Sequence, residues 1–126
     1  MIESQTDKIS IGDIKPFVFK AMLEFIYCGY VDLTENLALD LLQPADKYGL
    51  NTLKGICGEF LLDYITIKNF QERGEIAEKL EIPVLIEGTI SYIITNLKYI
   101  EDTIGLDNLP KSFLVKIILK QNQLFK

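Results

Sequence analysis

The side chains best suited to chemistry are few in this chain. It has no histidine, which removes the usual general base and the commonest zinc ligand. Its two cysteines, Cys28 and Cys57, lie far apart without a CxxC pair, and we interpret both as buried apolar thiols in a reducing compartment. The eight glycines form no phosphate-binding loop, and no serine lies in a GxSxG turn. We therefore expect neither an enzyme nor a bound cofactor or metal.

One acidic cluster could suggest a divalent cation site. Glu72, Glu75 and Glu78 recur every three residues, which places them along one flank of a helix. Arg73 and Lys79 alternate with them, so we interpret the cluster as a solvated helix face.

Length and composition predict a folded protein. The 126 residues suit one domain or slightly more, and 48% hydrophobic residues can build a core. The net charge of -5 does not favour nucleic acid as a partner. No apolar run approaches the roughly 20 residues that cross a bilayer, and the first residues do not form a signal peptide. We expect a soluble intracellular protein, cytoplasmic or nuclear, without a membrane partner.

The elements that must position any site are mostly helices. Residues Lys8–Ile14 alternate polar and apolar types, which predicts a short strand. Pro16 begins a helix that ends at Cys28 and Gly29. Thr34 is the expected N-cap of the next helix, which Pro44 should kink or divide.

Asn51 should cap the most regular helix of the chain. Phe60 lies at the middle of its apolar stripe, and Lys54 lies on the opposite face. The stripe consists of Leu53, Ile56, Cys57, Phe60, Leu61 and Tyr64.

Three further helices are expected in the second half. They begin at Thr66 or Asn69, at Pro83 and at Pro110, and Ile100–Leu109 should be a turn and connection. The predicted fold is mostly α, with one short strand and about six helices.

Several segments together resemble the second half of a BTB/POZ domain. The family pattern F-x-x-M/L-L-x-F-I-Y-T-G corresponds to Phe19–Gly29, and L-L-x-A-A-D-K-Y-x-L corresponds to Leu41–Leu50. Leu53, Lys54 and Cys57 continue the match in the same order and spacing. The resemblance implies an α+β family fold, here a truncated BTB/POZ fold followed by helical hairpins.

The second half of the chain is similar to the helical extension of speckle-type POZ proteins and to the BACK region of kelch-type adaptors. Ile67 and Asn69, then Ala77–Leu80, carry this similarity. The expected domains are therefore residues 1–64, the C-terminal half of a BTB/POZ domain, and residues 65–126, a BACK-like extension.

The resemblance implies a protein interaction module, and more specifically a substrate-adaptor fragment of a cullin-3 ubiquitin ligase. Substrate recognition would lie in another domain. The cullin contact corresponds to Leu33, Leu37, Leu39 and Asp40 in this chain. Leu39 stands where the family motif has an acid, and Asp40 follows one place later.

A complete BTB/POZ domain begins with strands and helices that precede the position of Met1. This difference implies a fragment, a truncated gene model or a degenerate copy, in which Phe17, Met22, Phe25 and Ile26 lose a partner on the side of the sheet. The alternative function is therefore a truncated remnant or scaffold that self-associates through an exposed apolar face and binds no ligase.

Overall fold

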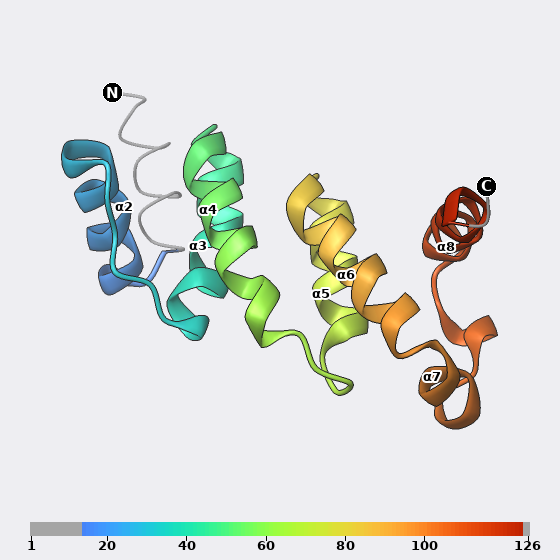
Figure 1. Cartoon of the computed structure of the whole chain (residues 1–126). Coiled ribbons are helices and arrows are strands. Elements are labelled where there is room, and N and C mark those ends of the chain that lie inside the picture. The colour runs from blue at the N-terminus through green and yellow to red at the C-terminus, as the bar shows by residue number, and fades with distance from the viewer. Residues whose placement is uncertain (1–13, 125–126) are drawn as a thin grey trace. The chain divides into compact units, whose positions relative to one another are not determined.

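Two compact units make up the chain. A computed structural model describes residues 14–124, with their side chains up to residue 121. The units are Met1–Leu61 and Leu62–Lys126. Within residues 14–124 the regular structure is entirely helical, so the mostly α fold class is confirmed (Figure 1). The strand predicted over Lys8–Ile14 lies outside the described residues, apart from Ile14 at its end.

Helix α2, Pro16–Cys28, has the predicted bounds. Pro16 begins it, and Gly29 ends it with a φ of 72° and an N–H that donates to the Phe25 carbonyl at 2.7 Å. Its buried residues are Val18, Ala21 and Met22. Its exposed apolar residues are Phe17 (53%), Leu23 (38%), Ile26 (55%) and Tyr27 (84%). Phe17 and Ile26 are thus exposed as expected, Phe25 is half-buried, and the expectation that Met22 is uncovered was wrong.

Helix α3, Glu35–Lys47, is not divided at Pro44. Proline removes one backbone donor, but the neighbouring Leu42 and Ala45 are fully buried, and their packing holds the helix together on both sides of it. The helix ends in a Schellman motif, in which the N–H of Leu50 donates to Ala45 at 2.8 Å and the N–H of Gly49 to Asp46 at 3.2 Å. Gly49 has a φ of 70°, which this turn requires.

Helix α4, Asn51–Leu61, packs against α3 and buries Leu53, Cys57 and Leu61 of the predicted stripe, but not Ile56, Phe60 or Tyr64. Asn51 is the first residue of the helix. The residues facing the core are Leu53, Cys57, Gly58 and Leu61. Ile56 is 39% exposed and Phe60 is only half-buried, so the expected position of Phe60 at the centre was wrong. Lys54 was also placed wrongly, because its side chain is 11% exposed and its Nζ lies 2.7 Å from Asp46 Oδ1 of α3.

The two cysteines differ in their surroundings. Cys57 is buried as predicted, and burial raises the pKa of its thiol to about 12. The prediction that Cys28 is buried was wrong: it is exposed, because it is the last residue of α2, beyond the part of that helix that packs on the core.

This difference predicts selective thiol labelling. At about pH 8 a disulfide reagent should modify Cys28 and leave Cys57 unmodified until denaturant is added, since the thiolate is the reactive form. The pKa of Cys57 is raised above its ordinary 9.0, so the folded state favours the neutral thiol. The stability that this gives the first unit is complete below about pH 9 and is lost as the pH rises toward 12. Counting labelled thiols in the wild type and in Cys28→Ser checks the first point. Labelling of both thiols in the folded wild type would contradict it.

The second unit contains four α-helices within its described residues. They are α5, Phe70–Lys79; α6, Pro83–Thr95; α7, Leu97–Thr103; and α8, Lys111–Leu124. Two 3₁₀ turns, Leu62–Tyr64 and Leu106–Asn108, complete it. Helix α7 extends through Thr103, so the turn and connection expected over Ile100–Leu109 was wrong for its first part, Ile100–Thr103. Ile100 is fully buried and fixes the helix to the core.

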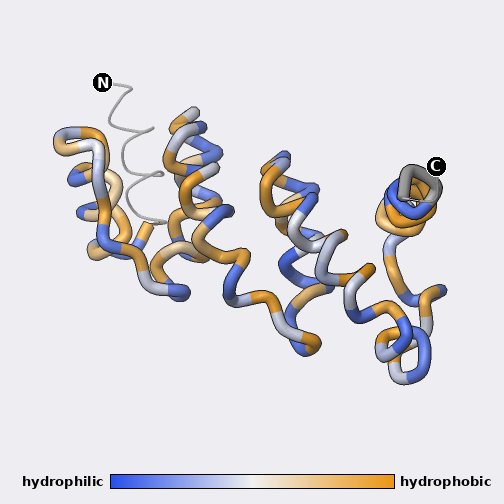
Figure 2. The backbone as a smooth tube through the Cα atoms, viewed as in Figure 1, coloured by the Kyte–Doolittle hydropathy of each residue, from blue (hydrophilic) through white to orange (hydrophobic). Residues whose placement is uncertain are grey.

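Thr66 and Asn69 were the two predicted N-caps of α5, and Asn69 occupies that position. Its side chain makes hydrogen bonds to the preceding turn and not to the helix. Its Oδ1 accepts from the Thr66 N–H at 2.8 Å, and its Nδ2 donates to the Tyr64 carbonyl at 3.0 Å. Pro83 begins α6 as predicted, and the Pro110 carbonyl accepts from the first turn of α8. Hydrophobic and hydrophilic segments alternate along these helices (Figure 2).

The core of the second unit joins residues from four helices and the loop before α8. Its buried members are Phe70, Ile90, Ile93, Ile100, Leu109, Phe113 and Ile117. Gly74 of α5 is buried, and the Phe113 ring of α8 fills the space where a larger residue would place its side chain. Arg73 is only 4% exposed, so the interpretation of this stretch of α5 as a solvated face was wrong at that residue.

Candidate partner-binding surface on α3

Thr34 positions the first turn of α3. Its backbone is extended, and its Oγ1 accepts a hydrogen bond from the Leu37 N–H at 3.2 Å. This is the predicted N-cap, and it makes Leu37 the third residue of the helix. Leu33 lies directly before the cap, and both leucines are half-buried. The cap therefore fixes the backbone that carries two of the four candidate residues.

The core-facing side of α3 separates the candidate residues into two groups. Its buried residues are Ala38, Leu41, Leu42 and Ala45. Leu37 and Leu39 differ by about 200° around a helix, so they lie on opposite flanks of this buried stripe. Both are half-buried for that reason.

Ion pairs show which neighbour each flank approaches. Asp40, three residues after Leu37, lies 3.7 Å from Lys15 Nζ at the start of α2. Asp46, seven residues after Leu39, pairs with Lys54 of α4. Leu37 and Asp40 therefore share the flank toward α2, and Leu39 lies on the flank toward α4.

Asp40 is only partly available to a partner. Its side chain is 35% exposed, and that of Lys15 is 67% exposed. Exposed pairs at this distance contribute little to stability, so a cationic partner could replace Lys15 at small cost. Lys15 could not be identified from the sequence, because no local spacing connects it to Asp40. Pro44 was not expected here either; it is half-buried and follows Asp40 by one helical turn on the same flank.

The chemistry that this surface offers is that of a contact surface. Among the residues that the structure describes, no group of three histidine, cysteine, aspartate or glutamate side chains could hold a metal ion. The surface offers half-buried leucines and one carboxylate, which suits contact with another protein.

Sequence comparison identifies the family of the first unit. A profile of the BTB/POZ domain matches residues 1–65. The chain belongs to the BTB/POZ family. Its α3 surface therefore lies in a domain whose members are protein interaction modules, generally without enzymatic activity.

A BTB/POZ relative extends the similarity beyond that profile. The BTB and MATH domain-containing protein 40 of Caenorhabditis elegans is 34% identical over 102 residues, which is 79% of this chain and 25% of the relative. The chain thus spans about a quarter of that relative's length. Because the aligned region is longer than 65 residues, it continues into the second unit. No helix in the described part of the chain is long and apolar enough to cross a membrane.

Proposed function

We propose that this chain is the cullin-binding part of a substrate adaptor for a cullin-3 ubiquitin ligase. Leu37 is the apolar anchor of the contact, with Leu33 beside the same N-cap and Asp40 on the same flank. The observation that carries the proposal is the half-buried Leu37 in the capped first turn of α3, within a BTB/POZ domain. The second unit is a BACK-like extension that adds to this module. The support for such an extension is that the similarity to a BTB-containing relative continues into the second unit.

The test is a calorimetric titration with the N-terminal repeat of a cullin-3. Leu37→Asp should weaken binding more than about tenfold, because interface anchors contribute at least that much. The fold should tolerate this change, since an acid in the first turn of a helix interacts favourably with the helix dipole. Melting temperatures measured on the same samples check the second point.

Two further variants complete the titration. Gln43→Asp is the matched control: it adds the same charge at an exposed site on α3 and should leave binding unchanged. Leu39→Glu restores the acid of the family motif on the opposite flank of α3, and stronger binding would show that this flank also contacts the cullin. If neither the wild type nor Leu39→Glu binds, the adaptor function is excluded.

Self-association is the second candidate function, and α2 favours it. Phe17, Ile26 and Tyr27 are each more than half exposed, and burying such apolar side chains against a second copy would be favourable. Light scattering on the titration samples distinguishes the two functions. A scaffold should show a mass well above 14.4 kDa without binding the cullin, whereas a monomer at high micromolar concentration would exclude this candidate.

A further inference from the structure

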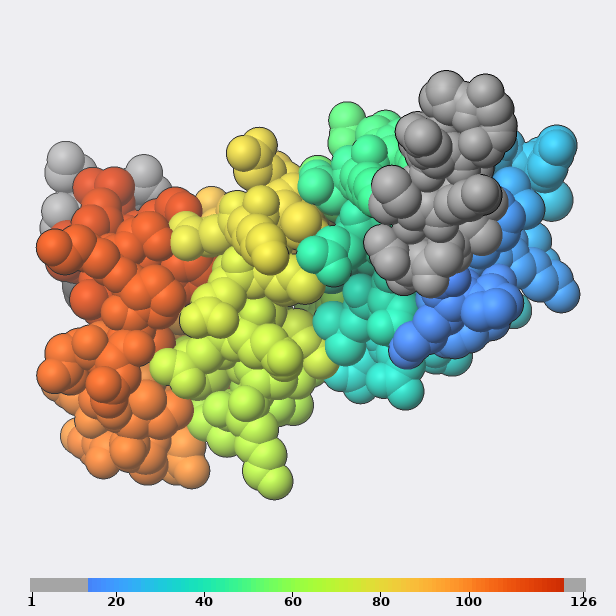
Figure 3. Space-filling view, turned by 180° about the vertical axis from the view of Figure 1, so that it is seen from behind, coloured from blue at the N-terminus to red at the C-terminus, as the bar shows by residue number. Residues whose placement is uncertain are grey.

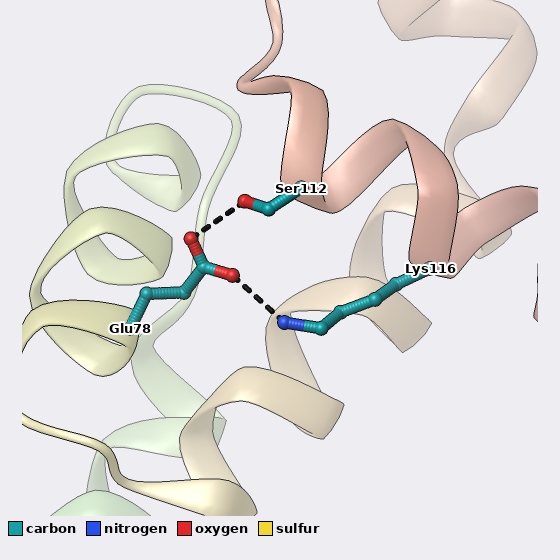
Figure 4. A network of polar contacts seen from close by, with 3 residues as sticks. All are labelled: Glu78, Ser112 and Lys116. Atoms are coloured by element: carbon teal, nitrogen blue, oxygen red, sulfur yellow. Dashed lines mark hydrogen bonds and ion pairs between the residues drawn. The ribbon is translucent and has the colours of Figure 1, made fainter.

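Glu78 of α5 connects this helix to α8, because each of its two carboxylate oxygens accepts a hydrogen bond from an α8 side chain. Ser112 Oγ donates to Glu78 Oε1 at 2.7 Å, and Lys116 Nζ donates to Glu78 Oε2 at 2.8 Å (Figure 4). Ser112 and Lys116 are one turn apart on α8, so both can bind the same carboxylate. We call Glu78, Ser112 and Lys116 the polar clamp. Phe113, next to Ser112, is 2% exposed and packs on Gly74 of α5. The polar clamp and the buried ring thus act on the same turn of α8.

The clamp is charged at neutral pH and lies near solvent. Desolvation alone would raise the pKa of Glu78, but the hydrogen bonds from Lys116 and Ser112 and the charge of Lys116 together hold that pKa below its usual value. The side chains of Glu78 and Lys116 are 27% and 40% exposed. A second negative charge beside Glu78 would therefore meet an ionised carboxylate.

Ser112 is accessible to a modifying enzyme. It is an exposed residue in the first turn of α8, which lies at the surface of the second unit (Figure 3). The segment before it is irregular, with Gly105 at a φ of 91°, a three-residue 3₁₀ turn and Pro110. Helix ends fray, and fraying here would present Ser112 in an extended segment next to Lys111.

We propose that Ser112 is a phosphorylation site and that phosphate at this position releases α8 from α5. A protein kinase would transfer the γ-phosphoryl group of ATP to Ser112 Oγ. The new bond joins Oγ to phosphorus, while the bond from that phosphorus to the bridging oxygen breaks to leave ADP. The hydroxyl proton passes to the base of the kinase.

The phosphate reverses the role of Ser112. The hydroxyl no longer donates to Glu78, and a group carrying about -1.5 to -2 charge takes its place. It repels the Glu78 carboxylate and competes for Lys116, which lies one turn along the same helix. The N-terminal amides of α8 also favour the phosphate. Helix α8 therefore stays helical, but its first turn no longer packs on α5, and Phe113 loses its contact with Gly74.

The experiment places phosphoserine at position 112 of the full chain and follows amide hydrogen exchange. Exchange in α8 and α5 should accelerate at least about tenfold, as expected when docking is lost, while α3 and α4 remain unchanged. Ser112→Ala removes one hydrogen bond without adding charge and should change exchange by less than about threefold. Glu78→Gln in the phosphorylated chain should restore most of the protection, because it removes the repulsion.

Three results would overturn the proposal. One is exchange in the phosphorylated chain within about twofold of the unmodified chain, which would mean that docking persists. Another is unchanged exchange after Glu78→Gln, which would mean that charge repulsion is not the cause. The third concerns the site itself: mass spectrometry of the protein from its own cells, with phosphatases inhibited, should find phosphate on Ser112, and its absence would exclude the modification.

Discussion

Gly74→Val is expected to lower the free energy of unfolding of the second unit by about 3 kcal/mol, at the upper end of overpacking costs. A Cβ at Gly74 would lie 2.4 Å from Cε2 and 2.6 Å from Cζ of Phe113, and 3.2 Å from Cγ2 of Thr89. Phe113 and Thr89 are both buried, so neither can move aside without disturbing the core. Glycine normally weakens a helix by about 1 kcal/mol relative to alanine, but here the space for Phe113 outweighs that preference.

Gly55 supplies the matched control for Gly74. It lies within α4 with no atom close to the position of a Cβ. Gly55→Ala should therefore stabilise the first unit by about 0.5 to 1 kcal/mol. Denaturant unfolding of both variants, and of Gly74→Val combined with Phe113→Ala, measures the effect. The double variant should cost less than the sum of its single changes, and additive costs would show that Gly74 and Phe113 do not interact.

The second large effect is expected at Leu41. This residue is 0% exposed at the centre of the buried side of α3. Leu41→Asp places an unpaired charge in the core, where its cost of several kcal/mol is comparable to the total stability of a small domain. The first unit should unfold, and circular dichroism should show a loss of helix at room temperature.

Leu37→Asp is the control for Leu41→Asp. It tests whether an aspartate anywhere on α3 destabilises the first unit, or only one in the core. It introduces the same side chain one turn earlier, at a half-buried position near the helix N-terminus. Its melting temperature should remain close to that of the wild type. Similar melting temperatures for the two variants would contradict the assignment of Leu41 to the core.

The family and the helix boundaries of the first unit could be predicted, because both depend on local sequence. Pro16 begins α2, Gly29 ends it, and Thr34 caps α3 through its own side chain. The BTB/POZ motifs are likewise contiguous runs, and the profile match to residues 1–65 confirmed them. The roles of Leu33, Leu37, Leu39 and Asp40 remain predictions, since they depend on a partner.

The buried stripe of α4 could be predicted less well from the sequence than the helix boundaries. An apolar helix offers several possible stripes, and the sequence places Phe60 and Cys57 in the same one. Packing against α3 selects Leu53, Cys57 and Leu61 and leaves Phe60 half-buried. The ion pair between Lys54 and Asp46 follows from the same rotation of the helix.

The sequence by itself determined that this chain is a mostly helical BTB/POZ protein, where its first helices begin and end, and that it has no histidine for acid–base chemistry. Only the tertiary structure decided which neighbour each flank of α3 approaches, through the ion pairs of Asp40 with Lys15 and of Asp46 with Lys54. It alone also showed that Glu78 of α5 pairs with Ser112 and Lys116 of α8. The physical reason is distance along the chain. Caps and turns act between neighbouring residues, whereas the contact of Gly74 with Phe113 joins helices whose meeting depends on the packing of the whole unit.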